Sequence, residues 1–99
     1  MIIKINQTDE AVKLIIEGNL ESTTIKPFSD KVSSIPGFGK NVEIDLAQVD
    51  YIDSSGIRAL LTLSKKMKDI DRKLVIVNCS DNIKRILKLS SLQDILLAE

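Results

Sequence analysis

Apolar residues recur with two different periods along this chain, and the two periods alternate from one segment to the next. Residues 41–46 (NVEIDL) place an apolar side chain at every second position, which is typical of a strand with one buried face. Beyond residue 56, apolar side chains recur three and four positions apart, as in an amphipathic helix. Strands that alternate with helices need parallel pairing and right-handed crossovers, so this pattern predicts an α/β fold.

Four segments have the composition and spacing of strands: residues 2–6, 11–18, 41–46 and 73–79. The first two are separated by the turn-like QTDE, which favours an antiparallel hairpin. The last, KLVIVNC, is apolar without interruption, which predicts a strand inside the sheet with both faces covered.

Three helices are expected between and after these strands. Thr24 is the expected N-cap of the first helix, with Pro27 in its first turn, where a missing N–H is tolerated. Ser80 is the expected cap of the third. Residues 36–41 read as a loop, and residues 90–99 as a short helical turn followed by a brief edge strand. The second helix follows residue 53, and Ile57, Leu60, Leu61, Ser64 and Met67 form a stripe along one face of it.

The predicted fold is therefore a mixed sheet of four to five strands with helices packed mainly on one face. A chain of 99 residues supports one core, so residues 1–99 are expected to form a single domain. Fourteen basic and fourteen acidic residues give zero net charge, which argues against a nucleic-acid-binding surface.

Composition also limits location and chemistry. We expect a cytoplasmic protein without membrane insertion, because the chain has no apolar run of transmembrane length and no signal peptide. Histidine is absent, which removes the commonest acid–base residue and metal ligand, and no phosphate-binding loop is present. We therefore expect no metal, no cofactor and no enzymatic activity. The one cysteine, Cys79, is expected to be a small buried hydrophobe.

The motif Asp53-Ser54-Ser55-Gly56 lies where a strand and loop give way to the second helix. In one interpretation it is only a junction: Asp53 or Ser54 caps the helix, and Gly56 permits close packing. In another it is a phosphorylation site, because a serine at a helix N-terminus is exposed and its phosphate would change a docking surface without unfolding the domain.

An aspartic protease is the enzymatic alternative, since its motif is an apolar run ending in Asp-Thr-Gly or Asp-Ser-Gly. Here the glycine follows Asp53 by three positions instead of two, and helical patterns interrupt a chain that should be nearly all strand. The sequence also lacks a G-x-S-x-G elbow and any histidine to activate a serine. These departures argue against a hydrolase.

Three stretches together resemble the STAS domain, and most of all the bacterial anti-sigma-factor antagonists. They are GNLESTTI, NVEIDLAQVDYIDSSGIRALL and KLVIVNCSDNIKRILKLSSL, which fall in the order and spacing of that family. The resemblance extends from about Val12 to Leu97.

The resemblance implies partner switching. In that family the unphosphorylated antagonist binds an anti-sigma factor that is also a serine kinase; phosphorylation releases it, and a PP2C-type phosphatase restores binding. The implied phosphoacceptor is Ser54. The implied partner-binding residues are Gly18, Asn19, Leu20, Glu21, Asp53, Ser54, Ser55, Gly56, Ile57 and Arg58.

The chain departs from the family pattern in two places. Glu21 replaces the usual aspartate of the G-x-L-D turn, and the chain ends at Glu99, where many relatives continue into a final helix. An alternative therefore stays open: a STAS-only subunit of another complex, either a lipid-transport ATPase or a signalling switch without a sigma factor. The two serines of the motif favour the phosphoswitch.

Overall fold

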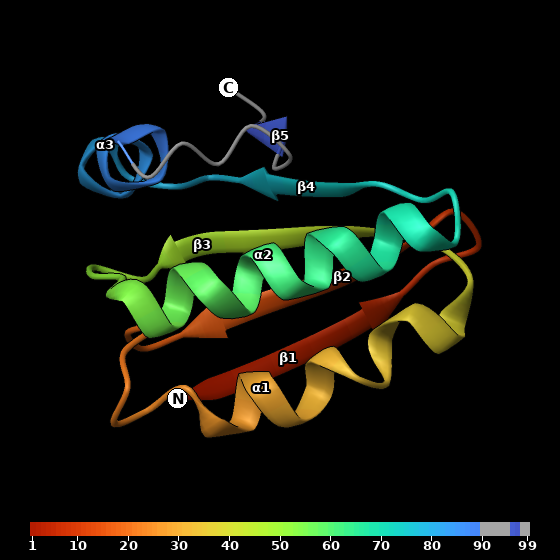
Figure 1. The fold of residues 1–99 in the computed structure, drawn as a ribbon, viewed down its shortest axis with the longest axis horizontal. Helices are drawn as coiled ribbons and strands as arrows, with labels where there is room; N and C mark the ends of the chain where they lie inside the picture. The colour runs from red at the N-terminus through yellow and green to blue at the C-terminus, as the bar shows by residue number, and fades with distance from the viewer. Residues whose placement is uncertain (90–95, 98–99) are drawn as a thin grey trace.

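The structure is a computed structural model that describes residues 1–89 and 96–97. Figure 1 shows a sheet with strand order β1-β2-β3-β4-β5. The strands are β1 Ile2–Gln7, β2 Ala11–Glu17, β3 Asn41–Gln48, β4 Leu74–Val77 and β5 Leu96–Leu97. The helices are α1 Lys26–Val32, α2 Ser54–Asp69 and α3 Asp81–Leu89, with a single 3-10 turn η1 at Ile35–Phe38.

The sheet is mixed, as the sequence predicts. β1 pairs with β2 antiparallel, whereas β2–β3, β3–β4 and β4–β5 are parallel. Helices α1 and α2 lie on the same face of the sheet (Figure 1). The α/β fold with helices mainly on one face is therefore confirmed, and so is the brief edge strand at β5. The helical turn expected within residues 90–95 lies outside the described residues.

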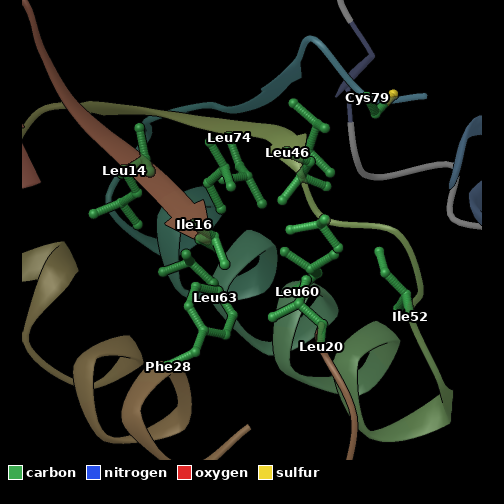
Figure 2. Packing of buried hydrophobic residues seen from close by; sticks show 14 of the residues in the cluster. Leu14, Ile16, Leu20, Phe28, Leu46, Ile52, Leu60, Leu63, Leu74 and Cys79 are labelled. Carbon is green, nitrogen blue, oxygen red and sulfur yellow. The ribbon is translucent and has the colours of Figure 1, made fainter. Parts of the chain in front are cut away.

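The core lies between the sheet and these two helices, and Ile83 and Leu87 of α3 belong to it as well. The alternation in β2 and β3 decides which side chains face it, and the parallel register aligns them in rows across the strands, such as Leu14 beside Ile44 and Ile44 beside Ile76. Figure 2 shows Phe28 of α1 and Leu63 of α2 in the same buried cluster. Full burial is shared by Leu14, Ile44, Ile76, Phe28 and Leu63.

Two local expectations need correction. Thr24 does not cap α1: the N-cap residue is Ile25, and it makes no side-chain capping bond. The Thr24 hydroxyl instead donates to the carbonyl oxygen of Asn19 at 2.6 Å, which closes the loop after β2. Residues 36–41 are not wholly a loop, because η1 covers Ile35–Phe38.

Strand β4 was expected to be covered on both faces. It does lie inside the sheet, between β3 and β5, but only Leu74 and Ile76 are buried. Val75 and Val77 are half-buried, because α1 and α2 cover the opposite face. Capping of α3 by Ser80 is confirmed, since its hydroxyl accepts the N–H of Ile83 at 3.3 Å.

Candidate functional site

Two loops meet beyond the carboxyl ends of β2 and β3, and they position the start of α2. Leu20 and Ile52 form an isolated parallel bridge that continues the β2–β3 pairing past the ends of both strands. The Leu20 N–H donates to the Tyr51 carbonyl at 3.1 Å, and the Asp53 N–H donates to the Leu20 carbonyl at 3.0 Å. The loop after β2 is thus fixed directly against the residue that precedes α2.

The loop after β2 is held from within as well. Gly18 has φ +107°, a conformation that residues with a side chain rarely adopt. The side-chain oxygen of Asn19 accepts the N–H of Asp50 at 3.2 Å, while the Asn19 carbonyl accepts the Thr24 hydroxyl. Since Asn19 bonds to both segments, the loop around residues 18–24 and the loop before α2 behave as one structural unit.

Asp53 joins this unit to α2 through both oxygens of its carboxylate. Oδ1 accepts the N–H of Ser55 at 2.8 Å and of Gly56 at 3.1 Å, which is an N-cap of the first helical turn. Oδ2 accepts the N–H of Ser22 at 2.8 Å. The Ser22 bond is the main cause of a pKa below the ordinary value for Asp53; the bonds from Gly56 and Ser55 act in the same direction, and partial burial opposes them.

Gly56 allows the loop after β2 to approach α2 this closely. A Cβ atom at position 56 would lie 2.5 Å from the Leu20 carbonyl oxygen, 2.7 Å from the Leu20 Cβ and 2.9 Å from the Ile52 Cγ2. Leu20, Ile52 and Leu60 belong to the same buried cluster (Figure 2). The glycine is therefore required by packing and not by its own backbone angles.

Ser54 is the first residue of α2 and its side chain is exposed. Among residues 1–89 and 96–97, none hydrogen-bonds to its hydroxyl. Asp53 is the adjacent carboxylate, but it already accepts three backbone N–H groups and has a lowered pKa, so it is poorly suited to act as a general base. The Ser54 hydroxyl is therefore exposed to solvent, and Asp53 does not activate it as a base.

The structure brings the ten residues expected at the partner-binding surface to one end of the molecule, but it orients them differently. Gly18, Ser54 and Arg58 are exposed. Asn19, Glu21, Asp53, Ser55 and Ile57 are half-buried. Leu20 and Gly56 are buried, so they shape this surface from below and are inaccessible to a docked protein.

The sequence patterns do not indicate several residues that belong to this site. Ser22 and Thr24 act through hydrogen bonds to residues distant along the chain or within the loop, which no local pattern signals. Tyr51 is 46% exposed in the loop before α2, which leaves a large aromatic side chain on the surface beside the motif. The Asn82 amide donates to the Asp50 carbonyl at 3.4 Å and so connects the start of α3 to this loop.

Comparison with known proteins identifies the family that this fold and site define. Residues 3–98 match the family model of the STAS domain, and the chain belongs to the STAS domain family. Among curated proteins, it is 23% identical over 95 residues to the anti-sigma-B factor antagonist of Staphylococcus aureus, covering 95% of this chain and 88% of the relative.

Solved structures show the same fold. The anti-sigma factor antagonist SpoIIAA in its unphosphorylated form superimposes with a TM-score of 0.77 at 15% identity, covering 99% of this chain and 88% of the other. The Bacillus cell fate determinant SpoIIAA in its phosphorylated form gives a TM-score of 0.75 at 18% identity, covering 99% and 92%. Within residues 1–89 and 96–97, no helix has the length and apolar character needed to cross a membrane.

Proposed function

We propose that this protein is a partner-switching regulator of the anti-sigma-factor antagonist type. In its unphosphorylated form it binds an anti-sigma factor that is also a serine kinase, and phosphorylation of Ser54 releases it. A PP2C-type phosphatase then restores the binding form. The similarity to a curated anti-sigma-B factor antagonist over 95% of the chain supports this assignment. In this proposal residues 1–99 act as one cytoplasmic domain that is a kinase substrate and not an enzyme.

One observation favours Ser54 as the acceptor above all others: its exposed hydroxyl stands on a helical turn that is already capped by a different residue. Asp53 accepts the N–H groups of Ser55 and Gly56, so the turn does not depend on the Ser54 side chain. A phosphate on Ser54 would add about 1.5 to 2 negative charges that point to solvent. The domain would stay folded while its binding surface changes.

The partner surface in this proposal comprises Gly18 to Glu21 and Asp53 to Arg58. A docked protein would cover the exposed residues, and the new phosphate would then lose its hydration unless the partner supplied compensating charge. This surface carries the acidic Glu21 and Asp53 beside the basic Arg58, so a dianion there makes it more negative and opposes any partner surface that fits the unmodified form.

The test uses Ser54→Ala and Ser54→Asp, with Ser33→Ala at the exposed residue that follows α1 as the matched control. Binding is measured by calorimetry against an anti-sigma-type serine kinase from the same organism. We expect Ser54→Ala and Ser33→Ala to bind like the wild type, and Ser54→Asp to bind about tenfold more weakly or worse. Incubation with the kinase and ATP, followed by mass spectrometry, is expected to place the phosphate on Ser54.

Modification at another residue only, or equal binding by Ser54→Ala and Ser54→Asp, would contradict the phosphoswitch. Equal binding together with co-purification of an ATPase subunit would favour the alternative of a STAS subunit in a transport complex. Urea unfolding of each variant establishes that any loss of binding does not come from loss of the fold.

A further inference from the structure

Arg58 lies on α2 one helical turn beyond Ser54, and its position gives it a role in the phosphorylated state. It is exposed, and none of the ion pairs found among the described residues includes it. With Ile25, Ser29 and Ser55 it borders a groove of about 310 Å³ between α1 and α2. No acidic side chain lines that groove.

Helix geometry puts Ser54 within reach of the Arg58 side chain. Residues four apart on a helix are neighbours on its surface, with Cβ atoms about 5–6 Å apart. Long side chains on a helix lean toward its N-terminus, so the surface that Arg58 covers lies over the turn that begins at Ser54. The Arg58 side chain is long enough for its planar donor group to reach an anion on the Ser54 oxygen.

Two of the usual helix donors are occupied at this turn. In many helices the first free backbone N–H groups would bind a phosphate, but here the N–H groups of Ser55 and Gly56 donate to Asp53. The other charged side chains of the adjoining segments do not replace them. Asp53 and Glu21 are acidic, and Lys26 of α1 is paired with Asp30 at 3.3 Å.

We infer that Arg58 binds the phosphate of phosphorylated Ser54 within the same chain, through a bidentate guanidinium–phosphate pair. This inference rests on the proposed function and names the device by which the modified state is held. Arg58 is a positioning residue: it fixes the phosphate over the first turn of α2 and reduces its repulsion from Asp53. When Arg58 pairs with the phosphate, its positive charge is drawn away from the α1–α2 groove that it lines. One phosphate therefore changes both the start of α2 and the adjoining groove.

The experiment installs phosphoserine at position 54 during translation, so that it does not depend on any kinase. The phosphate is then titrated by phosphorus NMR in the wild-type background, in Arg58→Gln and in the control Lys65→Gln. Lys65 is an exposed cation on the same helix, about 16 Å from Ser54 along the axis. A second measurement follows the Arg58 guanidinium Nε–H resonance with and without the phosphate.

A cation beside the phosphate favours its dianion, so it lowers the second pKa of phosphoserine from its usual value of about 6. We expect this pKa to be about 0.3 units higher in Arg58→Gln than in the wild type, as for an exposed helical ion pair, and unchanged in Lys65→Gln. The Arg58 Nε–H resonance is expected to shift when the phosphate is present.

Equal phosphate pKa values in the wild type and Arg58→Gln, with an unmoved Arg58 resonance, would overturn the inference. An equal shift in Lys65→Gln would also overturn it, because that result assigns the effect to general charge. These outcomes are separate from failure of the proposed function, which would appear as a kinase that does not modify Ser54 while the installed phosphate still pairs with Arg58.

Discussion

Asp53 caps a helix and fastens a distant loop at the same time, because its two carboxylate oxygens face different segments. Oδ1 faces the first turn of α2, and Oδ2 faces the Ser22 N–H, 31 residues earlier in the chain. An N-terminal carboxylate is also favoured by the helix dipole. The negative form of Asp53 is therefore the form that the folded state stabilises.

This arrangement predicts a pH-dependent effect of Asp53→Asn. Asparagine can still cap the helix, but its amide cannot accept the Ser22 N–H with a charged oxygen. The native pKa lies below the ordinary 3.8, so the carboxylate stabilises the fold above that pH and the contribution is lost as pH falls through the native pKa. We expect Asp53→Asn to unfold at lower urea concentration than the wild type at pH 7, with the gap closing on acidification.

Urea unfolding at pH 7, 5 and 3 measures this directly. The control is Asp69→Asn, an exposed carboxylate in the last turn of α2, where the helix dipole disfavours a negative charge. That variant should be as stable as the wild type or slightly more stable. A gap for Asp53→Asn that stays constant across the three pH values would contradict the role given to the charge.

At the scale of elements, the junction between α2 and the loop after β2 depends on the absence of a side chain at position 56. The loop carbonyl of Leu20 occupies the space that a Cβ would need. Helix propensity alone favours alanine over glycine by about 1 kcal/mol inside a helix. For an alanine at position 56, the steric cost of the Cβ and the gain in helix propensity act in opposite directions. The larger of these two free energies decides whether the protein becomes more or less stable.

We expect Gly56→Ala to lower the free energy of unfolding by roughly 1–3 kcal/mol, because overpacking against a backbone oxygen outweighs the propensity gain. Chemical denaturation gives this value. The matched control is Gly37→Ala, where a Cβ meets nothing within 4 Å and φ is ordinary, so its stability should change little. A Gly56→Ala protein as stable as the wild type would show that the loop can move aside.

Most of the strands and helices could be predicted from the amino-acid sequence. The alternation in residues 11–18 and 41–46 is a strong signal, because burial on one face imposes a fixed period. The expected stripe of α2 is confirmed only in part: Ile57 and Leu61 are half-buried, whereas Leu63, which the stripe leaves out, is fully buried. The start of α1 was not predictable: Thr24 has the right type for a cap, but its hydroxyl bonds to Asn19, five residues back. The hydrogen bond that closes the loop after β2 thus outweighs the preference of threonine for a helix N-cap.

At the scale of the whole molecule, the single cysteine reports on opening of the core. Cys79 follows β4, is 9% exposed and belongs to the main buried cluster, at the right of Figure 2. Burial raises the pKa of its thiol, with nearby Lys84 partly opposing the shift. Less of the reactive thiolate is therefore present at neutral pH than for a free cysteine.

We expect a disulfide reagent such as DTNB to modify native Cys79 at least about tenfold more slowly than the urea-unfolded chain at pH 8, since both access and thiolate content are reduced. Absorbance at 412 nm follows the reaction, and glutathione under both conditions provides the reference for the effect of urea on the reagent. The chain has no second cysteine, so the signal needs no correction. Equal native and unfolded rates would place the thiol outside the core.

The amino-acid sequence by itself determined the order of strands and helices, the side chains of β2 and β3 that face the core and the residue types of the motif at Asp53 to Gly56. These follow from periodicity and from local chemistry, which act over a few residues. Only the tertiary structure decided that Gly18 to Ser22 would meet the start of α2, that Leu20 and Gly56 would lie beneath the surface, and that Asp53 would bond to Ser22. Those contacts join residues about thirty apart, and they form only when parallel pairing brings the ends of β2 and β3 together.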